Sequence, residues 1–127
     1  MVSAYQAAQA AARKAIEATY SGRATVTERK KIRDERTKIT KEVPVIVLED
    51  QPCKLSYETL QAASDSGLVS AVTQVTKLFI SPDVSIREGS KITVVQNGVT
   101  DDYAFSGIPA VYPTHQEIVL KPFKRWA

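Results

Sequence analysis

The chain from residue 70 onward is a succession of short segments that alternate polar and apolar residues, with turn-forming residues between them. Strands are predicted at residues 72–80, 91–96, 99–105, 110–112 and 115–123. The Asn97-Gly98 dipeptide between two of these segments is a strong signal for a tight hairpin turn. Many short strands joined by turns form a small barrel or sandwich. The sequence therefore predicts a mainly β fold with a small β-barrel as its body.

A helix is predicted over residues 3–20. Ser3 and Gln6 have the spacing of a capping box, an alanine-rich stretch follows, and Ser21-Gly22 supplies a stop. The helix has few large apolar side chains, among them Tyr5 and Ile16. Packing against a neighbouring subunit and a fraying surface helix are both open on this evidence.

A long, charged, protruding β-hairpin is predicted over residues 22–43, because residues alternate with period two on both sides of Asp34-Glu35-Arg36. Its outer part is nearly all polar. The apolar run at 43–48 is expected to enter the core. Residues 49–69 contain clusters of turn-forming residues, and a short helix is expected near 57–63.

Length and composition bound the remaining possibilities. A chain of 127 residues has room for one domain, so residues 44–127 are expected to form a barrel body that ends in a tail. No apolar run approaches the ~18 residues of a membrane span, so no membrane partner is expected. One cysteine and one histidine allow neither an internal disulfide nor a four-ligand zinc site, and a reducing compartment is expected.

Charge is segregated along the chain. Residues 22–42 carry a net charge of +4, residues 43–120 carry −5, and the tail from 121 carries +3. This distribution suits binding to a polyanion or an acidic neighbour, and it suits head-to-tail self-association. It is equally what a solvated ribbon needs in order to avoid edge pairing. The basic stretch contains no aromatic residue, which counts against a stacking platform for single strands.

The sequence contains no motif typical of an enzyme or a cofactor site. A Gly-rich phosphate loop and a nucleophile elbow are missing. Asp101 and Asp102 are adjacent in a predicted strand, so their side chains point to opposite faces. His115 is expected to form a local hydrogen bond, and Cys53 is expected to be a small buried residue. We therefore predict a protein that is not an enzyme and that uses no cofactor or metal.

Candidate contact residues lie in the helix, the hairpin and the tail. Trp126 stands beside Lys124 and Arg125, and such a terminal indole docks either on the domain's own surface or on a partner. The candidate contacts with another subunit or partner are Tyr5, Ile16, Arg29, Lys30, Lys31, Arg33, Arg36, Lys38, Lys124, Arg125 and Trp126.

Three segments carry a resemblance to a known family. They are Lys77–Asp83 (KLFISPD), Ile86–Val94 (IREGSKITV) and Gly107–Ile118 (GIPAVYPTHQEI). Over roughly residues 50–127 the chain resembles the small phage structural proteins known as minor capsid or head-tail joining proteins. The resemblance is to the head-closure (stopper) type from long-tailed phages of Gram-positive hosts, and its motifs are structural.

The resemblance implies a small β-barrel with a long loop or hairpin, assembled as a homo-oligomeric ring that is a dodecamer in the virion. The ring would lie in the neck, between portal and adaptor proteins on one side and tail-completion or tail-tube proteins on the other, after assembly in the host cytoplasm. Double-stranded DNA would pass through it independently of sequence. Gly89 and Ile92–Val94 would be barrel elements, and residues 23–42 would reach a neighbour or the lumen.

Two alternatives remain open. A tail-completion or terminator ring protein would differ in its binding partner. An OB-like nucleic-acid-binding barrel would need aromatic side chains on an exposed sheet face. Tyr103, Phe105 and Tyr112 are the candidates for that role, and packing in the core explains them at least as well.

Overall fold

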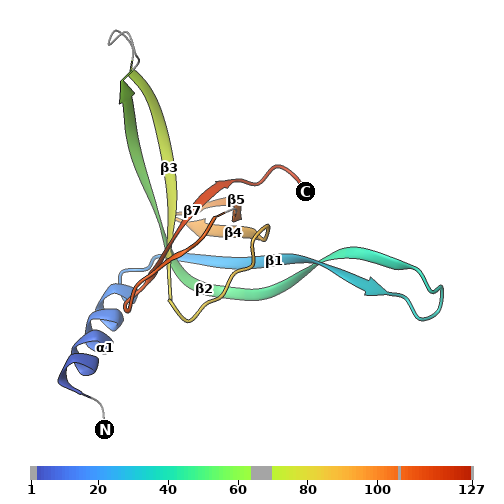
Figure 1. The fold of residues 1–127 in the computed structure, drawn as a ribbon, viewed down its shortest axis with the longest axis horizontal. Helices are drawn as coiled ribbons and strands as arrows, with labels where there is room; N and C mark the ends of the chain where they lie inside the picture. The colour runs from blue at the N-terminus through green and yellow to red at the C-terminus, as the bar shows by residue number, and fades with distance from the viewer. Residues whose placement is uncertain (1–2, 64–69, 106, 127) are drawn as a thin grey trace.

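A computed structural model describes residues 3–63, 70–105 and 107–126. In these residues the chain forms one helix followed by seven strands. The elements are α1 (Ala4–Glu17), β1 (Gly22–Arg33), β2 (Thr40–Ala63), β3 (Ser70–Ile80), β4 (Lys91–Gln96), β5 (Val99–Phe105), β6 (Ala110–Val111) and β7 (Gln116–Pro122). The strands curl into a small body from which the helix and two hairpins project (Figure 1).

Six of the strands close into an antiparallel barrel. Each strand pairs with the next around the ring in the order β1, β2, β3, β7, β5 and β4, and β4 pairs with β1. Leu120 of β7 closes the ring, because it stands opposite Thr76 of β3 and also opposite Phe105 of β5. The short strand β6 adds to the other part of β7. The predicted fold class, a small barrel with a long hairpin and an N-terminal helix, is confirmed.

The core is built from two side chains of each barrel strand, spaced two residues apart. Because alternate residues of a strand point to the same face, this spacing places both members of a pair inside the barrel. The pairs are Ala24 and Val26, Cys53 and Leu55, Leu78 and Ile80, Ile92 and Val94, Tyr103 and Phe105, and Ile118 and Leu120. None of the twelve is more than 8% exposed. Burial of each large side chain contributes about 1.5–3 kcal/mol, so this small core stabilises the closed ring.

Strand β2 belongs to both projecting hairpins. Its first part pairs with β1 and its second part with β3, and Cys53 is the point of change because it stands opposite Gly22 of β1 and Ile80 of β3. Strand β1 pairs with β4 only as far as Thr27. The ribbon of residues 28–45 therefore extends beyond the barrel, and we call it the arm. The arm and the β2–β3 hairpin leave the body in different directions (Figure 1).

The helix prediction is confirmed in position and in its N-terminal cap. The backbone NH of Gln6 donates to Ser3 Oγ, and the backbone NH of Ser3 donates to Gln6 Oε1, both at 3.1 Å. The helix ends at Glu17, three residues earlier than predicted. Gly22 does not end the helix; it begins β1, where an added Cβ would meet the carbonyl oxygen of Cys53 at 3.0 Å. The close approach of the two strands therefore favours glycine, because a side chain there would have to displace its neighbour by a few tenths of an ångström.

Two sequence predictions about the middle of the chain are wrong. The apolar run at 43–48 does not enter the core: Ile46 is 53% and Val47 40% exposed, and only Leu48 packs against the core. Residues 49–63 form neither a turn nor a short helix, because β2 continues through them with a hydrogen-bonded neighbour. The predicted turn at 64–67 lies outside the described residues.

Two of the turn-forming residues at 49–52, Glu49 and Asp50, form a β-bulge, whereas Gln51 and Pro52 pair with Ala24 and Arg23 of β1. The register between β1 and β2 shifts between Ala24 and Val26, where Asp50 adopts a φ of 50°, and shifts again between Val26 and Thr27. A bulge places two residues of one strand opposite one of its neighbour and often has a left-handed residue. The same residue types that end a strand at a turn therefore form a bulge in this strand without ending it, and the second register shift lies where the arm leaves the barrel.

Candidate assembly interface

The turn at the tip of the arm is fixed by its own hydrogen bonds. Asp34 Oδ1 accepts from the backbone NH of Arg36 at 2.9 Å, and the backbone NH of Lys38 donates to the carbonyl of Asp34 at 2.7 Å. Lys38 adopts a φ of 60°, and Asp34 also donates its backbone NH to the carbonyl of Ile39 at 2.9 Å. The predicted centre of the hairpin is confirmed, and the turn presents Arg36 and Lys38 at its exposed end.

The strands of the arm place their basic residues on the surface. Arg29, Lys31 and Arg33 alternate along β1 and so share one face, opposite Pro44, Glu42 and Thr40 of β2. Arg29 forms an ion pair with Glu42 at 3.3 Å, and Lys38 with Glu35 at 3.7 Å. Among the described residues, Lys30, Lys31, Arg33, Arg36 and Lys41 form no ion pair. These exposed cations are available to an acidic surface.

The C-terminal tail folds back against the root of the arm. Trp126 packs edge-on against Phe123, with ring centroids 5.1 Å apart, and Lys91 Nζ lies 5.2 Å from the Phe123 ring. Trp126 also lines a cleft of about 330 Å³ together with Glu28, Arg29, Glu42 and residues 87–90. Of the two dockings predicted for this indole, the structure shows the one on the domain's own surface. Lys124 and Arg125 are exposed beside it.

The helix α1 faces the barrel with one side and solvent with the other. None of its residues is buried, and Tyr5 is 72% exposed. Ile16, in the last turn of the helix, lines a cleft of about 170 Å³ against the barrel together with Tyr20 and Phe79. Two helix residues were predicted to contact a partner. Of these, Tyr5 is open to solvent, whereas Ile16 packs the helix against its own barrel.

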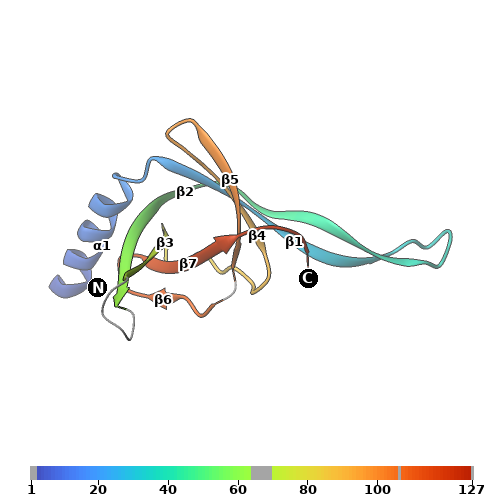
Figure 2. The same ribbon diagram turned by 90° about the horizontal axis from the view of Figure 1, so that it is seen from above.

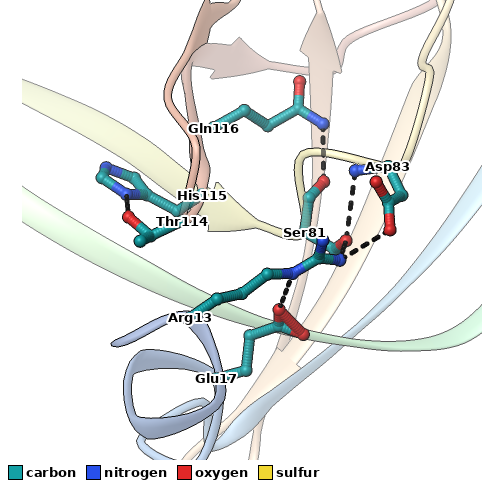
Figure 3. A network of polar contacts seen from close by, with 7 residues as sticks. All are labelled: Arg13, Glu17, Ser81, Asp83, Thr114, His115 and Gln116. Carbon is teal, nitrogen blue, oxygen red and sulfur yellow. Dashed lines mark hydrogen bonds and ion pairs between the residues drawn. The ribbon is translucent and has the colours of Figure 1, made fainter. Parts of the chain in front are cut away.

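A single arginine ties the helix to the barrel (Figure 3). Arg13 donates through Nη2 to Ser81 Oγ at 2.6 Å and to Asp83 Oδ2 at 2.7 Å, and through Nε to Glu17 Oε2 at 2.7 Å. The hydrogen bonds to Asp83 and Glu17 raise the pKa of the Arg13 guanidinium above its ordinary value. Ser81 is itself buried, and the side chain of Gln116 donates to its carbonyl at 2.8 Å. The helix is thus held at one polar point.

The residues considered as candidates for catalysis or metal binding lie in surroundings that give them structural roles. Cys53 is fully buried, and burial raises the pKa of its thiol to about 12, so it stays protonated near neutral pH. His115 forms the predicted local hydrogen bond, with Nδ1 3.0 Å from Thr114 Oγ1 and Nε2 3.2 Å from Glu117. Asp102 accepts from Thr93 Oγ1 at 2.6 Å. In the described part of the chain, no three metal-ligating side chains come together.

The clustered aromatic residues are divided between core and surface. Tyr103 is 8% and Phe105 4% exposed, so both are core residues, whereas Tyr112 is 45% exposed and stacks on His115. Burial, with a hydrogen bond to Tyr57, raises the pKa of Tyr103 to about 12. These residues do not form the exposed aromatic face that an oligonucleotide-binding barrel uses for stacking. No helix within residues 3–63, 70–105 and 107–126 is long and apolar enough to cross a membrane.

Sequence reasoning did not find the contacts that connect the elements. The side chain of Gln96 accepts from the backbone NH of Leu55 at 2.8 Å, and Gln116 holds the loop at Ser81. Gln116 stands in alternation with Ile118 and Leu120, which could have indicated that its amide lies inside. Nothing in the sequence indicated that Arg13 meets residues almost seventy positions away.

Comparison with known proteins finds similarity among solved structures. No family model matches the chain, and no curated protein matches it. Among solved structures, it is similar to the phage-like element PBSX protein xkdH from Bacillus subtilis, with 15% identity and a TM-score of 0.46. The match covers 79% of this chain and 91% of that chain. That protein comes from a phage-like element, and a likeness at this level does not assign a function to this chain.

Proposed function

We propose that this protein is a non-enzymatic structural component of a phage virion, a head-closure protein that forms a connector ring between the portal-adaptor complex and the tail. The observation that carries the proposal is the arm, a long hairpin of which no residue is buried. An isolated two-stranded hairpin is only marginally stable in water. The arm therefore has the properties of a part that is completed by a neighbour.

The other projections support the same proposal. The helix α1 has no buried residue and is tied to the barrel at one polar point. The tail presents Lys124 and Arg125 at the surface. The sequence resemblance to head-closure proteins covers roughly residues 50–127, which form most of the barrel, and the barrel is the part whose core closes within one chain. A barrel with projections that bury little surface fits a subunit of an assembly.

The charge distribution suggests how the parts are used. DNA must slide through a connector, and a strongly basic lining would hold its phosphates. The body over residues 43–120 carries a net charge of −5 and the arm region over 22–42 carries +4. We assign the body to the channel wall and the arm to contacts with neighbouring proteins. Phosphate contacts carry no sequence information, so passage of DNA is independent of sequence.

The test is the mass of the purified protein, alone and mixed with the portal-adaptor complex of the same phage genome. We expect binding at a fixed ring stoichiometry, measured by native mass spectrometry. The triple variant Arg29→Glu, Lys30→Glu and Lys31→Glu should lose this binding while its circular dichroism spectrum stays that of the folded protein.

Three other results would change the assignment. Binding to the tail tube and not to the portal-adaptor complex would make the protein a tail-completion protein. Retention on single-stranded DNA, with affinity that falls steeply as salt rises, would favour a nucleic-acid-binding barrel. Unchanged portal binding by the triple variant would show that the arm's cations do not contribute to assembly.

A further inference from the structure

The two faces of the arm differ in chemistry. Residues that stand opposite each other in an antiparallel pair lie on the same face. By the observed register, Lys30 lies opposite Val43, and Ile32 opposite Lys41. The face defined by these pairs also includes Val45, opposite Glu28, and Ile39 at the turn. One face of the arm therefore carries four branched aliphatic residues flanked by Lys30 and Lys41, and we call it the apolar face.

The apolar face continues the inner surface of the barrel beyond its end. Along β1, the side chains of Ala24 and Val26 point into the core, and the even-numbered positions that follow them are on the arm's apolar face. The inner part of this face is partly covered, since Val43 and Val45 are half-buried and Glu28, on the same face, forms an ion pair with Arg87 at 3.7 Å. The outer part is open to solvent: Ile32 is 50% and Ile39 52% exposed. Branched aliphatic residues exposed in a row on a ribbon mark a surface that packs against something.

The opposite end of the barrel has a complementary surface. Tyr57 of β2 and Val99 of β5 continue the core-facing positions of their strands, and they are 53% and 58% exposed. Asp101 lies on the same face of β5 as Val99 and is exposed. Asp101 forms no ion pair among the described residues. We call Tyr57, Val99 and Asp101 the rim.

The arm and the rim of one chain point away from each other. Strand β1 starts at the rim end, where Arg23 stands opposite Val95 of β4, and it runs toward the arm. The tip of the β4–β5 hairpin and the arm extend from different ends of the body (Figure 2). An arm therefore cannot cover the rim of its own chain. The two surfaces are nevertheless complementary, because both are apolar and Lys30 and Lys41 of the arm are opposite in charge to Asp101 of the rim.

We propose that the apolar face of the arm packs on the rim of a second copy of this chain, with Lys30 and Lys41 beside the partner's Asp101. The contact joins two different surfaces, so it is heterologous and leaves an arm and a rim free at the ends of any dimer. Such contacts generate closed rings when the rotation between copies closes. The inference rests on the proposed function only in requiring that copies assemble, and it names the surfaces that do so.

Cross-linking between copies tests the contact directly. Two single variants, Val43→Cys and Val99→Cys, are mixed and treated with a short bifunctional maleimide. The native Cys53 is fully buried and does not compete. We expect a covalent heterodimer of the two variants, identified by mass. Thr40→Cys lies on the other face of the arm, opposite Arg33, and its mixture with Val99→Cys is the matched control.

The experiment is run on the free protein at high concentration and on the protein bound to the portal-adaptor complex. Absence of the Val43–Val99 product in both samples, or an equal yield with the control, would overturn the proposed contact. If no cross-link forms but the protein still binds the portal-adaptor complex, the proposed contact is refuted and the proposed function is not. If the cross-link forms but the protein does not bind the complex, the proposed function is refuted and the contact is supported.

A charge reversal provides an independent readout. Lys41→Glu should weaken self-association, measured by sedimentation, by about tenfold or more, because it places two acids together at the contact. Asp101→Lys alone should weaken it similarly. Mixing the two variants should restore association between them, since each supplies the charge that the other lacks. Failure of the mixture to recover would contradict the pairing of these residues.

Discussion

Replacement of Arg13 by alanine should release helix α1 from the barrel without unfolding the barrel. The side chain of Arg13 forms the hydrogen bonds that connect the helix to the loop at Ser81 and Asp83. No residue of the helix is buried, so little hydrophobic burial remains to hold it once the arginine is removed. A free helix of this length is marginal in water, and it should therefore fray.

The magnitude follows from the exposure of each partner. Asp83 is 78% exposed, so its ion pair with Arg13 is screened and contributes only a few tenths to about 1 kcal/mol. The bond to Glu17 joins two residues of the helix itself; it supports the helix by about 0.3–0.5 kcal/mol but does not count toward docking on the barrel. Ser81 is buried, and a charge-assisted hydrogen bond to it contributes about 1 kcal/mol. The sum is about 1–2 kcal/mol, which corresponds to a factor of roughly 5–30 in the equilibrium between docked and released helix.

Hydrogen exchange measures this equilibrium. The amides of residues 8–17 should exchange about 5–30 times faster in Arg13→Ala, while those of β4 and β5 keep their rates. Lys14→Ala is the matched control, because it removes a long cationic side chain from the adjacent position, for which no ion pair is found among the described residues. Arg13→Lys should be intermediate, since an ammonium group lacks the fork that reaches several acceptors. Equal exchange rates in the alanine variant and the wild type would refute the idea of a single polar tie.

Three further predictions concern the barrel and the arm. Leu78→Ala should lower the free energy of unfolding by about 2–5 kcal/mol, whereas Val119→Ala, at a position 53% exposed, should change it by less than about 0.5 kcal/mol in the same urea titration. The thiol of Cys53 has a pKa raised from 9.0 to about 12 in the folded state, so the unfolded state loses this proton first and stability falls as pH rises above about 9. Between pH 8 and about pH 10.5 this loss should reach about 2 kcal/mol, and it should be missing from Cys53→Ala, as urea unfolding at both pH values will show. Replacement of residues 29–44 by a two-residue Asn-Gly turn should leave the thermal midpoint within a few degrees of wild type, because no residue of that segment belongs to the core; a large drop would mean that the arm stabilises the barrel.

The barrel could be predicted from the sequence because each strand and turn is indicated by residues that are close together in the chain. Alternation of apolar residues and the Asn97-Gly98 turn defined β4 and β5 with the bounds that the structure shows. The helix was predicted on equally local grounds, from its capping box. The prediction of a turn at residues 49–52 failed because pairing with a neighbouring strand overrides the local preference of these residues. Asp50 and Pro52 are turn-forming residues, yet pairing with β1 on both sides of them keeps β2 continuous as a bulged strand.

The candidate interface could be predicted only in part. The basic residues of the arm are visible in the sequence, because charge can be counted without knowing the fold. The apolar face could not be recognised, because Ile32 and Val43 come together only when the register between β1 and β2 is known. The register also explains why residues 43–45 stay outside the core: β4 pairs with β1 only as far as Thr27, and the residues opposite Glu28, Arg29 and Lys30 lie beyond that point.

The passage of β2 through both hairpins has a consequence for how this chain can tolerate change. A one-residue shift in the pairing of a strand turns every side chain to the other face. An inserted or deleted residue near Cys53 would therefore exchange the inner and outer faces of the arm or of the β2–β3 hairpin, even though both lie far from the change. Length variation is instead accommodated where it leaves the register intact, as an even number of residues at the tip of the arm or as an extra residue at the Asp50 bulge. The length of the arm can thus change without altering the pairing of the barrel strands, whereas the number of residues between the Asp50 bulge and Cys53 cannot.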